Sequence, residues 1–537
     1  MRRFAAAFLA ATLLAPLGIP CAASAAAHIH VLRWSDGLDV STLNPLLANT
    51  GNVVDLSRLT MAHFTRFDSN DTVVPELITK IPSTANGGIS RDGRTITYHL
   101  RRDVKWSDGV PFDADDVTYT VGAILNRANN VSNREAWDHV AGTREIDKYT
   151  VAFHLKMPYA PFATSFFGSG SLSCVLPKHV LGSAATINET AYNALPIGIG
   201  PFRYTAFHRG EAVEMEANPY YFRGKPKLAK IIYKIIPNEN TLYTQLQTGE
   251  LDLWASVGGT FAERVRHIAG VRTVTAPSPY ISAIFLNTTS PVTRDRNVRR
   301  ALRFATNRAY LLHNVYHDVG TLAESVVPQV ATDFDAGLPQ APYDPALAER
   351  ILDAAGWRRG PDGTRAKDGV ALVVNIAIPS DYAPSAVTAE LLRASWKAIG
   401  VGVEVKPFGD ALYFAPAASG GILFGGKFDA ALLSQAGGVM ANVAGSYGCV
   451  YAAPHGLNVT RYCNRAVDAG MRDYEASYDP KQRAELGRRF QRQIDADAPA
   501  IVTYERSFVF AFNAGLTGFA PTAFGTFDEF MAADMQP

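Results

Sequence analysis

The sequence has little of what marks several classes of protein. Only 4 of its 537 residues are cysteine, too few for a disulfide-stabilised scaffold. Charge of one sign is also lacking, because 51 Lys and Arg residues balance 50 Asp and Glu residues, and this excludes a generally polybasic nucleic-acid-binding protein. Beyond the N-terminal segment there is no internal repeat and no apolar run long enough to cross a membrane. What is present is 47% hydrophobic residues with 19% charged residues, which indicates a folded chain with a substantial core.

The N-terminal segment has the three parts of a secretory signal peptide. Arg2 and Arg3 precede an apolar run over residues 4–17, and small residues follow over 22–27. The apolar run is shorter than the roughly 20 residues that span a bilayer. We therefore expect residues 1–27 to direct export to the periplasm. The weaker alternative is a lipid anchor at Cys21, which a proline directly precedes.

Export makes disulfide bonds possible, and three cysteines remain after the signal peptide. Cys449 and Cys463 lie close together in a segment rich in Gly, Asn and Tyr, so we expect them to be joined. Such a bridge closes a loop of about 15 residues, a contribution of order 3 kcal/mol in the chain-entropy model. The alternative is a metal site with His455, which has no second histidine nearby. Cys174, flanked by apolar residues, is expected to be a buried thiol.

The pattern of apolar residues predicts an α/β protein whose first half is richer in strands. The expected strands are 95–100, 230–236, 280–286, 371–378, 401–406, 428–433 and 500–512. The expected helices are 113–126, 239–248, 295–316, 344–355, 385–399 and 482–496. Strands alternate with helices in the second half, which favours one sheet with crossover helices, and the two halves suggest two lobes.

Three segments invite an interpretation as catalytic or ion-binding motifs, and each has a simpler one. The segment 421–428 nearly fits a phosphate-binding loop, but Phe428 stands where a hydroxyl is needed. Ser169 lacks the strand-to-helix setting of a hydrolase nucleophile. The acids at 113–116 suit the start of a helix better than a calcium loop. We therefore expect no enzyme activity, no metal and no cofactor.

The mature sequence resembles the large solute-binding proteins of bacterial ABC importers, of the dipeptide- and oligopeptide-binding type. The segments that carry the resemblance, in the family's order, are 74–77, 90–101, 104–109, 111–117, 198–202, 218–226, 249–252, 286–288, 295–302 and 343–345. The resemblance implies a two-lobed periplasmic binding protein fold of type II, in the large class with an extra subdomain. It also implies a hinge of two crossing strands near 280–287 and 508–513, and a short loop disulfide where the cysteine pair falls.

The domain boundaries that the resemblance implies make the first lobe discontinuous. The signal peptide covers 1–27, and the parts of lobe I are 28–66, 198–283 and 508–537. The extra subdomain of lobe I covers 67–197, and lobe II covers 284–507. Such lobes close on a ligand without performing chemistry.

The sequence departs from peptide-binding relatives at the end of strand 428–433. Such relatives place a Trp and then an Asp there, and the Asp pairs with the peptide's α-ammonium group. Here the corresponding residues are Gln435 and Gly438, and an Arg that some relatives use for a carboxylate falls near Leu432. Because an unpaired buried charge is very costly, a ligand without an α-ammonium group is favoured. Asp39, in the first strand-to-helix turn, is an alternative counter-charge, although it could equally cap that turn.

The candidate ligand-binding residues follow from this resemblance and from aromatic residues at strand ends, which commonly line binding clefts. They are Trp34, Asp39, Trp254, Ser256, Asn287, Phe408, Tyr413, Ser434, Gln435, Ala436, Gly437, Gly438 and Tyr447, with Phe414 beside them. Trp254 is favoured because it follows 249–252, after which relatives place a cleft edge. Each aromatic residue could equally belong to ordinary core.

The resemblance implies a monomeric receptor that delivers a peptide-like or other small amphipathic ligand to an inner-membrane ABC permease. A sugar, an opine or a metal chelate is an alternative ligand. An exported hydrolase, or a sensor or chaperone on the same fold, is an alternative function.

Overall fold

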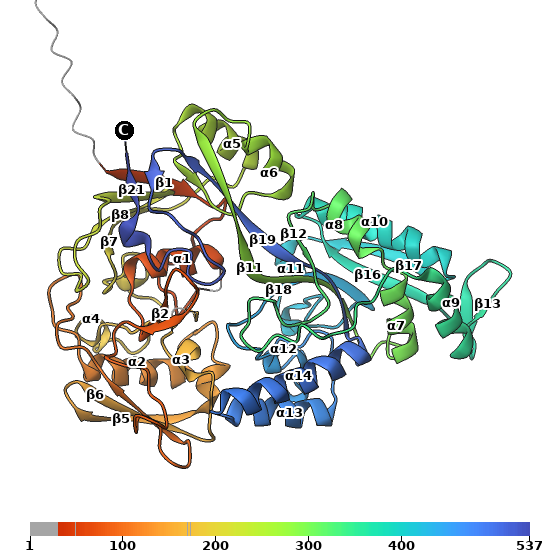
Figure 1. The fold of residues 1–537 in the computed structure, drawn as a ribbon, viewed down its shortest axis with the longest axis horizontal. Coiled ribbons are helices and arrows are strands. Elements are labelled where there is room, and N and C mark those ends of the chain that lie inside the picture. Colours follow the sequence, from red (N-terminus) through yellow and green to blue (C-terminus); the bar gives the residue numbers. More distant parts are fainter. Residues whose placement is uncertain (1–29, 49, 169, 172, 537) are drawn as a thin grey trace, which may run out of the picture.

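The computed structural model describes residues 30–48, 50–168, 170–171 and 173–536, so the expected signal peptide lies outside the described residues. One mixed sheet of 11 strands runs through the molecule in the order β17-β16-β18-β11-β19-β10-β1-β9-β8-β7, with β12 paired to β19 (Figure 1). We call the part built on β1 and β7–β10 lobe I, and the part built on β16–β18 lobe II. The domain boundaries given above remain a prediction.

The strands of lobe I are β1 (Val31–Ser35), β7 (Phe202–His208), β8 (Ala212–Ala217), β9 (Lys230–Lys234) and β10 (Leu253–Trp254). Those of lobe II are β12 (Gly320–Leu322), β16 (Val373–Pro379), β17 (Gly402–Phe408) and β18 (Ala430–Ala436). Smaller sheets contain β2 (Thr65–Phe67), β3 (Val73–Pro75), β4 (Thr95–His99), β5 (Val140–Asp147), β6 (Thr150–Leu155), β13 (Arg358–Arg359), β14 (Arg365–Lys367), β15 (Val370–Ala371), β20 (Leu516–Thr517) and β21 (Asp534–Met535).

Two long antiparallel strands, β11 (Val271–Leu286) and β19 (Ala500–Asn513), connect the lobes (Figure 1). Their pairing is regular from Val271 to Pro277 and then shifts before Ile281. Residues beyond the shift pair with β18 in lobe II, whereas the other end of β19 pairs with β10 in lobe I. The irregular stretch therefore lies at the passage from one lobe to the other.

The helices before β11 are α1 (Gly51–Thr60), α2 (Ala114–Leu125), α3 (Phe162–Ser165), α4 (Lys178–Leu181), α5 (Glu239–Thr248) and α6 (Gly259–Val265). Those after it are α7 (Arg296–Phe304), α8 (Arg308–Asn314), α9 (Pro345–Ala354), α10 (Ala383–Ala398), α11 (Asp410–Tyr413), α12 (Ala444–Tyr447), α13 (Arg465–Ala476) and α14 (Pro480–Asp497).

The acids at 113–116 do start a helix: Asp113 caps α2, and its side chain accepts a hydrogen bond from the backbone of Asp115.

The single helix predicted over 295–316 is wrong, because the structure divides it into α7 and α8. The Asn307 side chain accepts a hydrogen bond from the backbone N–H of Tyr310 and so caps a new helix. An asparagine inside an apolar helical pattern is such a start signal. The break turns α8 toward β12 and β19, where its first residue, Arg308, becomes buried.

Apolar side chains pack on both faces of the sheet in lobe II. Along β11, Ala283 and Phe285 join one buried cluster, whereas Ile284 and Leu286 join another. Successive side chains of a strand point to opposite faces, so the strand separates two cores. Because both faces of this part of the sheet are buried, polar residues are expected at the edge where the parallel strands end.

Candidate ligand-binding site

A pocket of about 350 Å³ lies at the carboxyl ends of the parallel strands of lobe II. Pro379 ends β16, Asp410 follows β17, and Ser434 lies near the end of β18. Ligands of open α/β sheets bind outside the carboxyl ends of parallel strands, because the loops there diverge. The lining residues are Ser282, Ala283, Ile284, Leu311, Tyr316, Pro379, Tyr382, Ser385, Thr388, Asp410, Phe414, Leu432, Leu433, Ser434, Thr503, Tyr504 and Arg506.

Aromatic rings form much of the pocket wall. Tyr316 and Tyr504 lie with their ring centroids 4.3 Å apart, and the Tyr316 hydroxyl is 3.0 Å from the hydroxyl of Thr388. Tyr382 and Phe414 remain 49% and 45% exposed. Exposed rings at the edge of a pocket offer apolar contact area to a ligand at little conformational cost.

The polar groups of the pocket include hydroxyls and one guanidinium. Ser282 and Ser434 face each other across paired strands, with their hydroxyl oxygens 2.8 Å apart. Arg506 lies on β19 opposite the irregular stretch of β11, with its guanidinium carbon 5.7 Å from the ring centroid of Tyr280. Its side chain is half-buried.

Asp410 is the carboxylate of the pocket wall. Its backbone N–H donates to a carboxylate oxygen of Asp381 at 3.2 Å. Burial raises the pKa of Asp410, and the charge of Asp381 raises it further. The two acids therefore give this edge of the pocket a negative potential.

Lobe I has two partly buried acids that the sequence did not single out. Burial raises the pKa of Asp36, next to β1, to about 6 and that of Asp55, on α1, to about 7. The Tyr233 hydroxyl donates to Asp36 at 2.5 Å. Asp36 directly follows β1, which is parallel to β9 and β10. An acid at the end of a predicted strand is the feature of the sequence that could have pointed to it.

Two acids of lobe I act on tyrosines in or beside the pocket wall. Glu239, the first residue of α5, raises the pKa of Tyr382, although burial contributes more. Asp55 likewise raises the pKa of Tyr280, again after burial. Part of lobe I therefore lies close enough to Tyr382 in the pocket wall, and to Tyr280 beside Arg506, to act on their charges.

The structure divides the predicted ligand-binding residues into distinct environments. Ser434 lines the pocket, and Phe414 lies with it. Four predicted aromatic residues are instead buried in the hydrophobic clusters of the two lobes, each at most 1% exposed. They are Trp34, Trp254, Tyr413 and Tyr447. A side chain enclosed by core atoms is held by packing, so contact of these rings with a ligand stays a prediction.

Two polar candidates have partners of their own. The Asn287 amide donates to the backbone oxygens of Gly426 and Phe428, which braces the loop before β18. Asp39 is exposed, and its carboxylate accepts from the backbone N–H of the next residue, Val40, so both its role as a counter-charge and its alternative role as a cap stay predictions. Ser256 is exposed after β10, in a left-handed conformation with φ of 57°.

The remaining candidates lie beside the pocket on lobe II. Phe408 is half-buried at the end of β17, and Gln435 and Ala436 end β18. Gly437 donates its N–H to Pro279 at 2.8 Å, and an added Cβ would lie only 2.4 Å from Pro328. The Gly at 437 is thus required by close packing.

A second pocket, of about 310 Å³, lies where the segments around β4 and α3 meet lobe II. Tyr478 donates its hydroxyl to the backbone oxygen of Gly93 at 2.9 Å and accepts from the N–H of Tyr159 at 3.2 Å. Nearby, burial raises the pKa of Glu475 to about 7, and the charge of Glu135 adds to the increase. Lobe II therefore also contacts the N-terminal region away from the crossing strands, below β11 in Figure 1.

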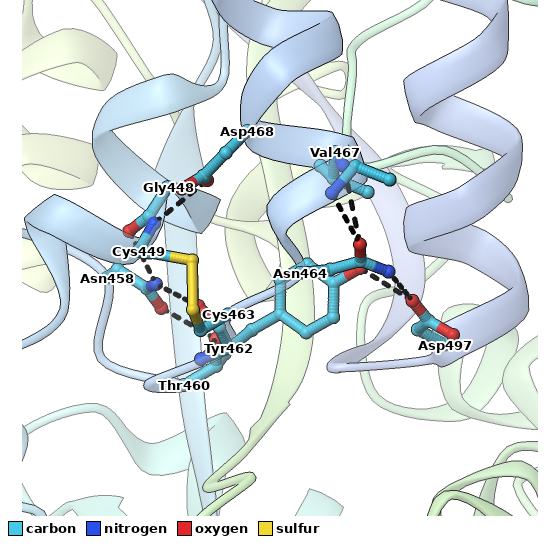
Figure 2. Close-up of a disulfide and its surroundings, with 11 residues drawn as sticks. Gly448, Cys449, Asn458, Thr460, Tyr462, Cys463, Asn464, Val467, Asp468 and Asp497 are labelled. Carbon is cyan, nitrogen blue, oxygen red and sulfur yellow. Dashed lines mark hydrogen bonds between the residues drawn. A yellow bond between two sulfur atoms is a disulfide. The ribbon is translucent and has the colours of Figure 1, made fainter.

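The predicted disulfide between Cys449 and Cys463 is confirmed (Figure 2). The Cys449 N–H donates to Asp468, the fourth residue of α13, and Asn464 caps that helix from the other side of the bridge. Tyr462 donates its hydroxyl to Asp497 at the end of α14. The bridge therefore fastens the loop to the helix pair α13 and α14, and Cys174 is buried as a free thiol.

Among the described residues, none of the helices is both long and apolar enough to cross a membrane. Within the same part of the chain, no group of three or more His, Cys, Asp or Glu side chains is arranged to hold a metal ion.

Comparison with known proteins gives consistent matches. The sequence model described as "Bacterial extracellular solute-binding proteins, family 5 Middle" matches residues 72–454. The chain is 32% identical over 433 residues to Protein XP55 of Streptomyces lividans, covering 80% of this chain and 76% of that protein. It is 24% identical over 484 residues to the dipeptide-binding protein of Escherichia coli strain K12, covering 86% of each.

Solved structures resemble this one over nearly its full length. NikZ from Campylobacter jejuni, in complex with Ni(L-His), has a TM-score of 0.81 at 23% identity, covering 94% of this chain and 99% of that chain. AppA from Bacillus subtilis, in complex with a nonapeptide, has the same TM-score and coverage at 22% identity. These likenesses confirm the fold class expected from the sequence.

Proposed function

This chain belongs to the bacterial extracellular solute-binding proteins of family 5, and we propose on that premise that it is the solute receptor of an ABC importer. It captures a small ligand between its lobes and delivers it to an inner-membrane permease. It acts in the periplasm as a monomer, exported by residues 1–27. The lobes close by bending of β11 and β19, since two rigid bodies joined by short segments move by hinging.

The pocket at the carboxyl ends of β16, β17 and β18 is the observation that carries this proposal. It combines exposed aromatic rings with hydroxyls, one carboxylate and one guanidinium, groups that can orient a small organic ligand. Closure of the lobes is expected to cover it. A covered site excludes water and strengthens each polar contact with the ligand.

Native mass spectrometry of protein purified from the periplasm without denaturation tests the function. We expect a fraction of the protein to carry a small molecule, because closed lobes slow its release. Unfolding and refolding should remove that mass, and adding an extract of the growth medium should restore it. Protein that takes up no small molecule from any such extract would contradict the receptor function.

For the ligand we propose a small amphipathic molecule without an α-ammonium group. A buried ammonium requires a counter-charge, and Gly438 stands where peptide-binding relatives have an acid. Packing does not explain the glycine: the nearest atom to an added Cβ at Gly438 is 3.5 Å away, an ordinary contact. Truncating one partner of a buried charge pair typically costs 2–5 kcal/mol, or roughly 30- to 5000-fold in affinity.

Calorimetry with free peptides of two to five residues checks this choice of ligand. We expect weak or undetectable binding to the wild type. Asp39→Asn and Asp410→Asn are run beside it, since Asp39 is the acid expected from the sequence and Asp410 is the acid in the pocket wall. Submicromolar binding that survives both substitutions would refute the counter-charge argument. Tight binding abolished by one of them would identify that acid as the ammonium partner.

A further inference from the structure

Arg506 is a half-buried cation in the pocket wall whose charge no neighbouring acid neutralises. Its guanidinium lies over the ring of Tyr280, and among the described residues no Asp or Glu carboxylate forms an ion pair with it. Arginine does not lose its charge in proteins, so it cannot adapt to partial burial by deprotonation. Two other arginines of lobe II, Arg308 and Arg365, are buried, and each bonds to a carboxylate and to backbone oxygens.

Two acids that could pair with Arg506, Glu505 beside it in sequence and Asp410 in the same pocket, do not form an ion pair with it. Glu505 precedes Arg506 on β19 and therefore points to the other face of the strand. Both of its carboxylate oxygens accept from the backbone N–H of Gln329. Asp410 lines the same pocket without reaching ion-pair distance, and its own neighbour is Asp381. The guanidinium thus keeps free donors on the pocket side.

The surroundings of Arg506 suit an amphipathic molecule. Burial raises the pKa of Tyr280, Tyr316, Tyr382 and Tyr504, and the positive charge of Arg506 opposes this increase in all four. The phenols remain neutral hydrogen-bond donors and flat apolar walls. Ile284, Leu311 and Leu432, which are almost fully buried, back the same pocket with aliphatic side chains.

We propose that Arg506 binds a carboxylate of the captured ligand, whose apolar body packs against Tyr316, Tyr382 and Tyr504. The ligand is then an amphipathic organic acid. A guanidinium offers two parallel N–H donors that match the two oxygens of a carboxylate, and such pairs are strong where water is excluded. This inference rests on the proposed function, because it assigns a ligand class to the receptor's own pocket.

A matched pair of probes tests the inference: N-acetyl-phenylalanine and N-acetyl-phenylalaninamide, which differ only in the carboxylate. Calorimetry and ligand-observed NMR should show the acid binding to the wild type at least about 10-fold more tightly than the amide. Arg506→Gln should abolish this preference. Arg506→Lys, which keeps the charge and loses the fork of donors, should retain part of it.

Arg272→Gln is the control, because Arg272 also lies over an aromatic ring, that of Phe512 at 5.7 Å, on β11 outside the pocket. It should leave the preference for the acid unchanged. Thermal melting of each variant checks folding, and Arg506→Lys serves if the glutamine variant is unstable. Equal binding of acid and amide, no binding of either probe, or a preference that survives Arg506→Gln would overturn the inference.

The molecules retained in native mass spectrometry separate this inference from the proposed function. A retained molecule with a carboxylate supports both. A retained molecule without any anionic group overturns the role of Arg506 and leaves the receptor function standing. Failure to retain or take up any molecule contradicts the receptor function itself.

Discussion

Replacing Ser434 by tryptophan is expected to weaken capture of the native ligand by at least about 100-fold. Ser434 is an exposed residue of β18 in the pocket wall, and its hydroxyl lies 2.8 Å from that of Ser282. An indole there occupies space that the ligand needs in a pocket of about 350 Å³. Each methylene-sized group displaced from apolar contact costs about 0.8 kcal/mol, so three or four of them account for roughly 100-fold.

The measurement is calorimetry with the ligand that native mass spectrometry identifies. Small-angle scattering provides a second readout, because the wild type should contract when the ligand closes the lobes and Ser434→Trp should not. Ser419→Trp is the control: Ser419 is exposed near α11 and outside the pocket, so its replacement should leave affinity and contraction unchanged. Full affinity in Ser434→Trp protein with an unchanged melting temperature would place the ligand elsewhere.

Local patterns in the sequence predict much of the fold. The acids at 113–116 correctly indicate the start of α2, and the apolar strand at 500–512 becomes β19 within one residue at its end. The break between α7 and α8 was missed because apolar periodicity continues through it. There Asn307 competes for the backbone, an effect that depends on one side chain rather than on the period.

The pocket was harder to predict than the fold, because composition does not say which face of a strand a ring occupies. Trp34 and Trp254 lie at strand ends, as cleft residues do, yet each is buried in a core cluster of lobe I. Arg506 was missed although its strand carries a signal. Glu505 and Arg506 are adjacent charges inside an otherwise apolar strand, and charges at such a place need a partner or a ligand.

Arg308 shows how lobe II holds the strand that carries Arg506. Its side chain is 7% exposed and donates to backbone oxygens of Ala323, Ala341 and Val502. It also donates to both carboxylate oxygens of Glu324, at 3.0 and 2.6 Å. One guanidinium thus joins the start of α8, the segments after β12 and before α9, and the beginning of β19.

Replacing Arg308 by methionine is therefore expected to destabilise lobe II by about 3–5 kcal/mol, the usual cost of removing one partner of a buried ion pair. Methionine fills part of the space but leaves three buried carbonyl oxygens without their donor. Denaturant unfolding followed by circular dichroism should show a transition at lower denaturant concentration. Arg300→Met on the exposed side of α7 is the control and should change stability by less than about 0.5 kcal/mol. Equal stability of the two variants would show that the Arg308 contacts contribute little to folding. In that case water would satisfy the carbonyl oxygens, and Arg303 alone would compensate the charge of Glu324.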